Sequence, residues 1–269
     1  MVQAQLKEMK IISYDGITVC ERLGEGATST VYRGMKDGRS IALKKLGTSV
    51  QKSQRVFRRE LAILAEVQHR NIPPLLGFCE SPVDFTVFLE LCKGGCVFDL
   101  LHNSNFKLEV SQQCTMLGDV AAAMAYLHGL RIIQRDLKSL NLLLMKTLAS
   151  SRDVPHVKMC DFGSSRRMET CSESKHMAMT KNVGTPIWMA PEVVSGKYCE
   201  KADVYSFAIV MYEVLACQIP YSNLESEEIH RAVLGGERPD LNDVVPETPP
   251  RLTHLMQRCW AHLPADRPN

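Results

Sequence analysis

Ile133-Gln134-Arg135-Asp136-Leu137-Lys138-Ser139-Leu140-Asn141 is the stretch that decides the fold of this chain. It forms a short polar break between apolar runs. Asp136 and Asn141 offer hard oxygen ligands, which suit Mg²⁺. Either residue alone is as often an ordinary turn residue, so the interpretation depends on the other polar segments of the chain.

A second polar break, Asp161-Phe162-Gly163, follows the apolar run 157–160. Asp161 adds another carboxylate of the kind that binds Mg²⁺. Three oxygen-bearing side chains in two such breaks indicate metal chemistry linked to phosphate groups.

Nearer the N-terminus, Ile41-Ala42-Leu43-Lys44 is predicted to be a strand in which Ala42 and Lys44 share one face. On a binding face, Ala42 leaves room for a flat ring and Lys44 carries charge toward phosphates. A lone strand lysine is more often a solvated edge residue. Glu60 shares a helical face with Phe57 and Leu64, and a buried carboxylate needs a partner. Lys44 is the partner we expect.

The segment from Leu23 to Val31 contains Gly24 and Gly26 between two predicted strands. Glycine lets a backbone approach a phosphate closely. Taken alone, an ordinary hairpin turn is the commoner interpretation. The glycines do not open a helix, which argues against a Rossmann-type dinucleotide-binding protein.

In this order, the segments resemble the protein kinase signature set. The stretch Gly184-Thr185-Pro186-Ile187-Trp188-Met189-Ala190-Pro191-Glu192 looks like the family's Ala-Pro-Glu segment. Asp203 stands where the family's buried central helix begins, and Arg267 looks like the late arginine that pairs with Glu192. The resemblance runs from Ile17 to Asn269. Lys138 and the form of the Ala-Pro-Glu segment are similar to serine/threonine kinases of the tyrosine-kinase-like group, near mixed-lineage and Raf-type kinases.

The resemblance implies an α+β, two-lobed protein kinase fold. A small antiparallel-sheet lobe with one main helix is expected at about 17–91, a hinge at about 90–95 and a larger helical lobe at about 96–269. An ATP cleft is expected between the lobes. Residues 1–16 are expected to be an N-terminal extension. The family's last helix normally continues beyond Asn269, so the C-terminal end looks truncated.

The resemblance also implies the roles of the site residues. Asp136 accepts or orients the substrate hydroxyl proton, Lys138 assists it, and Glu60 holds Lys44. Asn141 and Asp161 hold Mg²⁺. The residues expected to bind ATP are Leu23, Gly24, Glu25, Gly26, Ala27, Thr28, Ser29, Val31, Ala42, Lys44, Leu89, Glu90, Cys92 and Leu143.

The implied activity is transfer of the γ-phosphate of Mg-ATP to Ser and Thr hydroxyls of protein substrates in intracellular signalling. The alternative is a pseudokinase that acts as a nucleotide-binding or scaffold module. An upstream kinase is a possible partner, because Arg135 resembles the arginine that grips a phosphate of the activation segment. The candidate acceptors in that segment are Thr170, Ser172, Ser174, Thr180 and Thr185, with Thr185 facing the substrate hydroxyl.

Two departures from the family pattern concern the site. Gln134 replaces the histidine that packs under the phenylalanine of the family's Asp-Phe-Gly motif, here Phe162, and a polar, flexible side chain there predicts reduced activity. Thr28 and Ser29 replace an aromatic residue and the third glycine of the loop, which weakens its closure over the phosphates but keeps its backbone donors.

Composition narrows the class of protein. The 269 residues carry 32 basic and 30 acidic side chains, a net charge of +2, which argues against bulk-charge binding to nucleic acid. The apolar stretch 204–216 is too short to span a bilayer, and no signal peptide is evident at the N-terminus. Ten cysteines lack metal-binding spacing. We therefore expect reduced thiols and a cytoplasmic protein without membrane insertion.

Overall fold

The structure is a computed structural model that describes residues 16–26, 29–46, 50–81, 85–168, 186–194, 196 and 199–269. Seven of the candidate residues named above lie outside the described residues: Ala27, Thr28, Thr170, Ser172, Ser174, Thr180 and Thr185. The longer elements are β1 (Ile17–Glu25), β2 (Ser29–Lys36), β3 (Arg39–Leu46), α2 (Val50–Glu66), β4 (Leu75–Glu80), β5 (Phe85–Glu90), α3 (Val97–His102), α4 (Val110–Gly129), α6 (Glu200–Ala216), α7 (Ser226–Leu234) and α8 (Pro250–Cys259).

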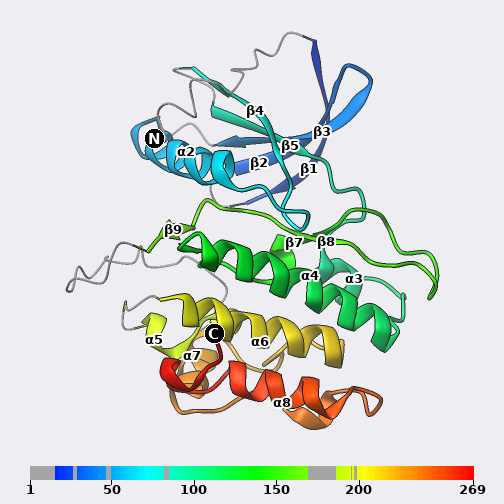
Figure 1. Cartoon of the computed structure of the whole chain (residues 1–269), viewed down its shortest axis with the longest axis vertical. Coiled ribbons are helices and arrows are strands. Elements are labelled where there is room, and N and C mark those ends of the chain that lie inside the picture. The colour runs from blue at the N-terminus through cyan, green and yellow to red at the C-terminus, as the bar shows by residue number, and fades with distance from the viewer. Residues whose placement is uncertain are drawn as a thin grey trace.

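The N-terminal lobe is built on one antiparallel sheet with the strand order β1-β2-β3-β5-β4 (Figure 1). The turn between β2 and β3 consists of Asp37 and Gly38, whose φ angles are +49° and +74°. Two left-handed residues match the twist of a tight hairpin.

Helix α2 belongs to the same lobe and packs its apolar face on β5. Phe57 is fully buried, and its ring lies 5.4 Å from that of Phe85 and 6.3 Å from that of Phe78. This aromatic cluster anchors the helix face that also carries Glu60.

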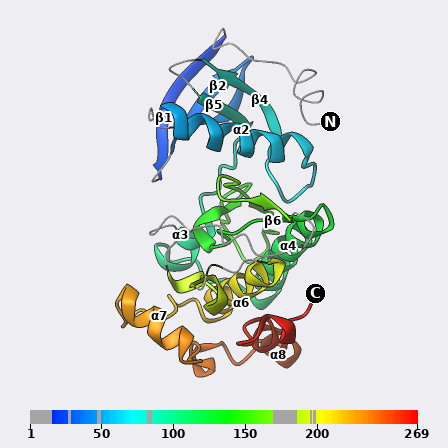
Figure 2. The ribbon, with the colours of Figure 1, turned by 90° about the vertical axis from the view of Figure 1, so that its left-hand side faces the viewer.

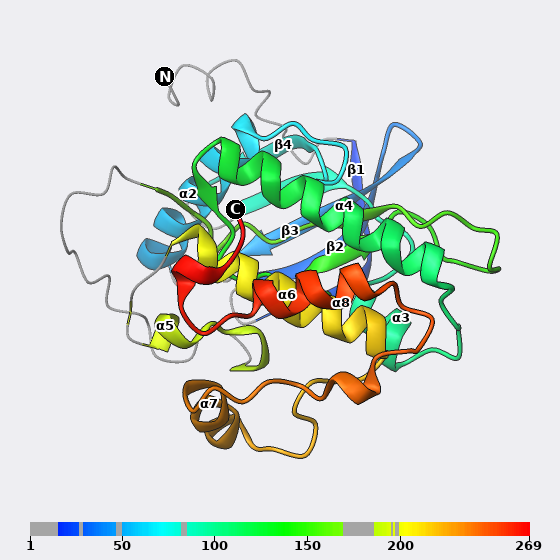
Figure 3. The ribbon, with the colours of Figure 1, turned by 60° about the horizontal axis from the view of Figure 1, so that its bottom comes forward.

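The C-terminal lobe stacks α4, α6 and α8 in successive layers (Figures 1 and 3). Nearly every residue from Ala202 to Ala216 is buried, as expected for a helix that is apolar on all sides. Helix α8 begins at Pro250, a residue suited to a first helical position because its missing N–H is not needed there. Figure 3 shows α7 at one side of this stack.

A narrow connection follows β5 and leads into the lower lobe (Figure 2). Its Gly94 donates its N–H to the Leu144 carbonyl at 2.8 Å. A Cβ atom on Gly94 would lie 2.4 Å from the carbonyl oxygen of Lys146. The two backbones therefore touch at a point where no side chain fits.

Further contacts join the loop after α2 to the lower lobe. Asn71 donates to the Val157 carbonyl at 2.9 Å, and its own carbonyl accepts the Met159 N–H at 2.8 Å. The Gln68 N–H donates to the Tyr126 hydroxyl at 2.9 Å. A separate ion pair, between Lys158 on β8 and Glu90 at the end of β5, joins the two lobes at 2.7 Å.

The α+β architecture with a small sheet lobe and a larger helical lobe is confirmed. Short strands in the lower lobe were not predicted, namely β6 (Ile132–Ile133), β7 (Leu142–Leu144), β8 (Val157–Met159) and β9 (Arg166–Arg167), apart from the apolar run 157–160. The remaining short elements are α5 (Pro191–Val194) and the 3₁₀ turns η1 (Ser139–Asn141), η2 (Pro186–Trp188), η3 (Leu241–Asp243) and η4 (Pro264–Asp266). No helix in the described part of the chain has the length and apolar character needed to cross a membrane.

Candidate active site

Lys44 on β3 lies between two carboxylates from different parts of the chain. Its Nζ is 2.6 Å from Glu60 Oε1 and 2.8 Å from Asp161 Oδ1. Lys44 is 8% exposed and Glu60 is 2% exposed. The predicted partnership of Lys44 and Glu60 is therefore confirmed, and Asp161 joins it across 117 positions of sequence.

These charges set one another's protonation. Burial alone would lower the pKa of Lys44, but the carboxylates of Glu60 and Asp161 outweigh it and raise that pKa. Burial would also raise the pKa of Asp161, but the Lys44 ammonium outweighs it and lowers that pKa below its ordinary value. The site thus presents one cation and one ionised carboxylate side by side.

Asp136 forms the second half of the cluster. Lys138 Nζ donates to both of its carboxylate oxygens, at 3.0 and 2.9 Å. Asn141 Nδ2 donates to the Asp136 carbonyl at 2.8 Å and to Asp136 Oδ2 at 3.0 Å. Burial raises the pKa of Asp136, although Lys138 and Asn141 act against the shift. A carboxylate of raised basicity is suited to accept a proton.

The donor set fits a Mg²⁺ ion that also binds phosphate. No group of three or more His, Cys, Asp or Glu side chains able to hold a metal occurs among the described residues. Mg²⁺ usually takes only one or two protein carboxylates and completes its shell with phosphates and water. Asn141 turns its amide nitrogen toward Asp136, so its amide oxygen is the atom suited to a metal, together with the carboxylate of Asp161.

Two buried acids on α6 support this cluster from below. Asp203 accepts the backbone N–H groups of Gln134 at 2.8 Å and Arg135 at 2.9 Å. Glu213 accepts from the Ser139 hydroxyl at 2.7 Å and from Trp188 Nε1 at 2.6 Å. Sequence reasoning missed the role of Glu213, although an acid within a helix that is apolar on all sides was a usable signal.

The residues expected to bind ATP outside the glycine turn come from both lobes. Ala42 pairs with Leu89 between β3 and β5, and Leu143 lies on β7, opposite Lys158 of β8. The side chains of Ala42, Leu89 and Leu143 are only partly buried. Six expected ATP-binding residues are partly buried: Val31 on β2, Ala42 on β3, Leu89 and Glu90 on β5, Leu143 on β7, and Cys92 just after β5.

The glycine turn closes tightly between β1 and β2. The Gly26 N–H donates to the Ser29 carbonyl at 2.8 Å. The described residues before this turn, from Leu23 to Gly26, are exposed, and Glu25 pairs with Arg22 at 2.6 Å. Leu23, Gly24, Glu25 and Gly26, all expected to bind ATP, are therefore accessible to solvent.

Gln134 is fully buried, and both ends of its side-chain amide are hydrogen-bonded. Its polar atoms bind the two segments that carry Asp136 and Asp161, and the reduced activity expected from the sequence stays a prediction.

The late arginine pairs as predicted. Arg267 donates to both carboxylate oxygens of Glu192, at 2.6 and 2.8 Å, and its side chain is fully buried. This bidentate pair joins the Ala-Pro-Glu segment to the end of the chain.

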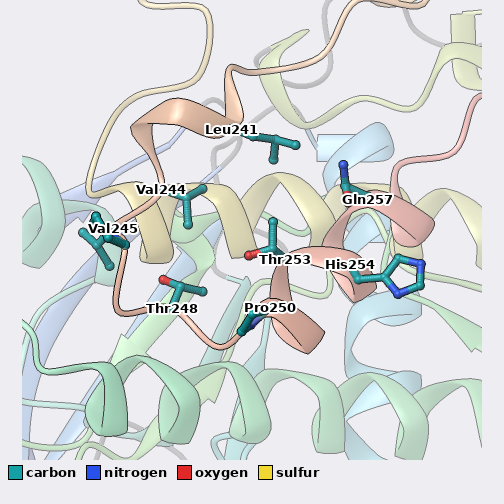
Figure 4. A pocket seen from close by; sticks show the side chains of 9 residues that line it. Leu241, Val244, Val245, Thr248, Pro250, Thr253, His254 and Gln257 are labelled. Carbon is teal, nitrogen blue, oxygen red and sulfur yellow. The ribbon is translucent and has the colours of Figure 1, made fainter.

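A separate hollow of about 320 Å³ lies between η3 and α8 (Figure 4). Its lining residues are Leu241, Val244, Val245, Pro246, Thr248, Pro250, Thr253, His254 and Gln257. This lining has no carboxylate and no lysine or arginine. It therefore lacks the groups that phosphate and metal chemistry requires, which the cluster around Lys44 and Asp136 supplies.

Comparison with known proteins agrees with this geometry. Residues 17–269 match the family described as "Protein tyrosine and serine/threonine kinase", and the chain belongs to that family. The match confirms the resemblance drawn from the motifs, including its tyrosine-kinase-like character.

Three curated relatives illustrate the range of names in the family. The chain is 36% identical over 263 residues to a probable serine/threonine-protein kinase of Dictyostelium discoideum, covering 96% of this chain and 27% of that protein. It is 35% identical over 258 residues to the Dual specificity protein kinase shkD of the same organism, and the match covers 92% of this chain and 32% of that protein. It is 33% identical over 266 residues to Serine/threonine-protein kinase STY17 of Arabidopsis thaliana, and the match covers 97% of this chain and 43% of that protein. The chain thus spans less than half the length of these relatives.

Proposed function

We propose that this chain is a protein kinase domain that transfers the γ-phosphate of Mg-ATP to Ser and Thr hydroxyls of protein substrates. The observation that carries the proposal is the convergence of Lys44, Asp136, Asn141 and Asp161 from three separate segments. Phosphoryl transfer needs little covalent chemistry from a protein and depends on positioning and on neutralising charge.

In this proposal Asp136 accepts the proton of the substrate hydroxyl as that oxygen bonds to the γ-phosphorus and the bond from phosphorus to the bridging oxygen breaks. Lys138 holds the Asp136 carboxylate in place through two hydrogen bonds. Lys44, fixed by Glu60, balances phosphate charge. Mg²⁺, when bound, supplies further positive charge at the phosphates, and Asn141 and Asp161 are the residues that would hold it.

Phosphate transfer from Mg-ATP to a generic basic protein tests this function. We expect Asp136→Asn and Lys44→Met to lower the rate by about 10²–10⁴-fold, the range that a positioned acid–base or charge-balancing group contributes. Asp99→Asn and Lys45→Met are matched controls, because Asp99 is an exposed acid on α3 and Lys45 is the neighbouring lysine of β3. No transfer by the wild-type domain would favour the pseudokinase alternative.

Serine, threonine and tyrosine peptides then define the acceptor. We propose Ser and Thr specificity because Lys138 stands two residues after Asp136, as in the serine/threonine pattern. Phosphorylation of tyrosine peptides but not of serine or threonine peptides would overturn the acceptor class while leaving the kinase activity intact.

We also propose control by an upstream kinase. Burial, together with the positive charges of Arg59 and Arg135, lowers the pKa of Arg166 to about 10. A guanidinium that two neighbouring cations repel is a group that an added phosphate would stabilise. The proposed acceptor is Thr180 or one of its neighbours Thr170, Ser172 and Ser174.

Replacing these acceptors by alanine tests the control. We expect loss of the activation that an upstream kinase produces, and Arg166→Gln should cause the same loss. Ser150→Ala, on a distant exposed loop, is the control. Full activity of the alanine variant after the same treatment would reject the proposal.

A cytoplasmic location completes the proposal. Cys92, Cys96, Cys114 and Cys160 are free thiols, which suits a reducing compartment. Imaging of the full-length protein that contains this domain would test the location.

A further inference from the structure

The hollow between η3 and α8 contains no residue of the cluster around Lys44 and Asp136, and the proposed function makes no use of it (Figure 4). Its volume is about 320 Å³. A cavity of roughly 150 Å³ holds one benzene molecule, and sites for drug-sized ligands begin at about 300 Å³. The hollow is therefore large enough for an aromatic ring that carries a short side arm.

Hydrocarbon groups form most of its lining. They belong to η3, the segment that follows it and the start of α8, and they are Leu241, Val244, Val245, Pro246 and Pro250. Burial of apolar surface here favours a ligand with an apolar body. Because the lining offers no lysine or arginine, it is unsuited to a phosphate group. These side chains favour a small organic molecule over a nucleotide.

One polar group of this lining has no partner. Thr248 is 6% exposed, and its hydroxyl oxygen is buried without a hydrogen bond to any group in the described part of the chain. The Thr248 backbone is held in place, because its N–H donates to the Val245 carbonyl at 3.0 Å. In Figure 4 the side chains of Thr248 and Thr253 point across the hollow toward Val244. A buried hydroxyl without a partner destabilises a fold, and an acceptor atom on a ligand would satisfy it.

The start of α8 adds a partial positive charge at the same hollow. The N-cap residue, Pro249, makes no side-chain hydrogen bond, and the first turn from Pro250 contains no acidic residue. Nothing in this turn therefore offsets the positive end of the helix dipole, which favours an anion. Two acids are close in sequence, but Asp243 accepts the Tyr212 hydroxyl at 2.6 Å and Glu247 is exposed outside the lining.

We propose that this hollow binds a small aromatic monocarboxylic acid in its ionised form. The apolar lining takes the ring, and the carboxylate accepts the Thr248 hydroxyl near the first turn of α8. Thr253 and Gln257, which also line the hollow from α8, offer further hydrogen bonds. The site goes beyond the proposed phosphate transfer and uses none of its residues.

The test uses 3-phenylpropionate as the probe and 3-phenylpropionamide as its uncharged counterpart. NMR titration of the isotope-labelled chain at pH 7.5 follows the backbone amide signals of Val245 and Thr248. We expect the carboxylate to bind with a Kd on the order of 0.1–1 mM, as suits a ligand of this size. The amide should bind about fivefold more weakly or worse, because it carries no charge for the helix end to stabilise.

Two variants locate the binding site. Thr248→Val keeps the shape of the side chain and removes its hydroxyl, so we expect at least about tenfold weaker binding of the carboxylate. Its thermal stability should be unchanged or raised, since the hydroxyl bonds to no described group of the protein. Val244→Trp fills the hollow with a larger side chain and should abolish binding. Thr115→Val is the matched control, because Thr115 lies on α4 outside the hollow and its hydroxyl donates to the Ser111 carbonyl.

Three results would overturn the proposal. The first is no shift of the Val245 and Thr248 signals up to about 10 mM probe, ten times the weakest expected Kd. The second is wild-type affinity in both Thr248→Val and Val244→Trp, and the third is tighter binding of the amide than of the carboxylate. No readout depends on phosphate transfer, so failure of the proposed function would leave this test intact.

Discussion

The contacts of Lys44 show which interactions of a single residue can be predicted from the sequence. Its partnership with Glu60 followed from the cost of burying a carboxylate on an apolar helix face, and that argument needs no knowledge of the fold. The contact with Asp161 could not be predicted in this way, because nothing local in the sequence relates two residues 117 positions apart. The kinase resemblance assigned Lys44 to ATP and Asp161 to Mg²⁺, but it did not predict this ion pair.

Gln134 shows the opposite case. The sequence predicts a polar, flexible side chain, but the Asp136 N–H and the Asp161 carbonyl that bind its amide come together only in the folded chain. The sequence therefore identified the unusual position but not its hydrogen bonds, and the expected reduction in activity stays a prediction.

Cysteine reactivity is a prediction at the scale of the residue. Burial raises the pKa of Cys92 and of Cys96 to about 11 each, so both remain thiols at pH 7.4 and the nucleophilic thiolate is scarce. We expect iodoacetamide to label them slowly at pH 7.4 and much faster toward pH 10, measured by mass spectrometry. Cys114, which is exposed on α4, is the internal reference. Labelling of Cys96 at the rate of Cys114 at pH 7.4 would contradict the prediction.

Elements whose hydrophobic pattern is local were predicted well. The hydrophobic pattern predicts strands at 30–35 and 40–45, a helix at about 52–68 and a buried helix at 201–218, and β2, β3, α2 and α6 lie within a few residues of these bounds. Strands β6 and β9 were not found, because each consists of two residues and exists only through pairing of Ile132 with Arg167 and Ile133 with Arg166. Strand β4 has Leu76 exposed and Gly77 at its centre, which obscures the alternation of a strand.

The junction of α5 with the end of the chain allows a prediction at the scale of the element. The Arg267 guanidinium bonds Glu192 and the carbonyls of Lys201, Ala261 and His262. Removing one partner of such a buried pair leaves a charge without compensation.

We therefore expect Arg267→Met to lower the free energy of unfolding by about 3–5 kcal/mol in urea denaturation. Arg251→Met, at an exposed position of α8, should change it by less than about 0.5 kcal/mol. Equal effects of the two substitutions would show that the buried pair adds nothing beyond an ordinary surface arginine.

For the whole molecule, the ion cluster of Lys44 joins the sheet lobe to the segment after β8. Its carboxylate neighbours raise the pKa of Lys44 above the ordinary 10.5. A group with a raised folded-state pKa contributes stability that is complete below its unfolded pKa and is lost as the pH rises through the folded value.

We expect the stability difference between wild type and Lys44→Met/Glu60→Gln to stay constant from pH 7 to 9 and to move against wild type above about pH 10.5. The double variant avoids leaving Glu60 buried without its partner. Chemical denaturation across this pH range measures the difference, and a constant difference up to pH 12 would show that the Lys44 pKa contributes no such linkage.

The close backbone contact at Gly94 bears on how the domain tolerates change. In a deep mutational scan, Gly94 should be as intolerant as a core residue although it is only partly buried, because any Cβ meets the Lys146 carbonyl. Its neighbour Gly95 has φ +79° and open space around it, so asparagine should be tolerated there best. Two adjacent glycines would then have opposite selection profiles, one set by volume and the other by chirality.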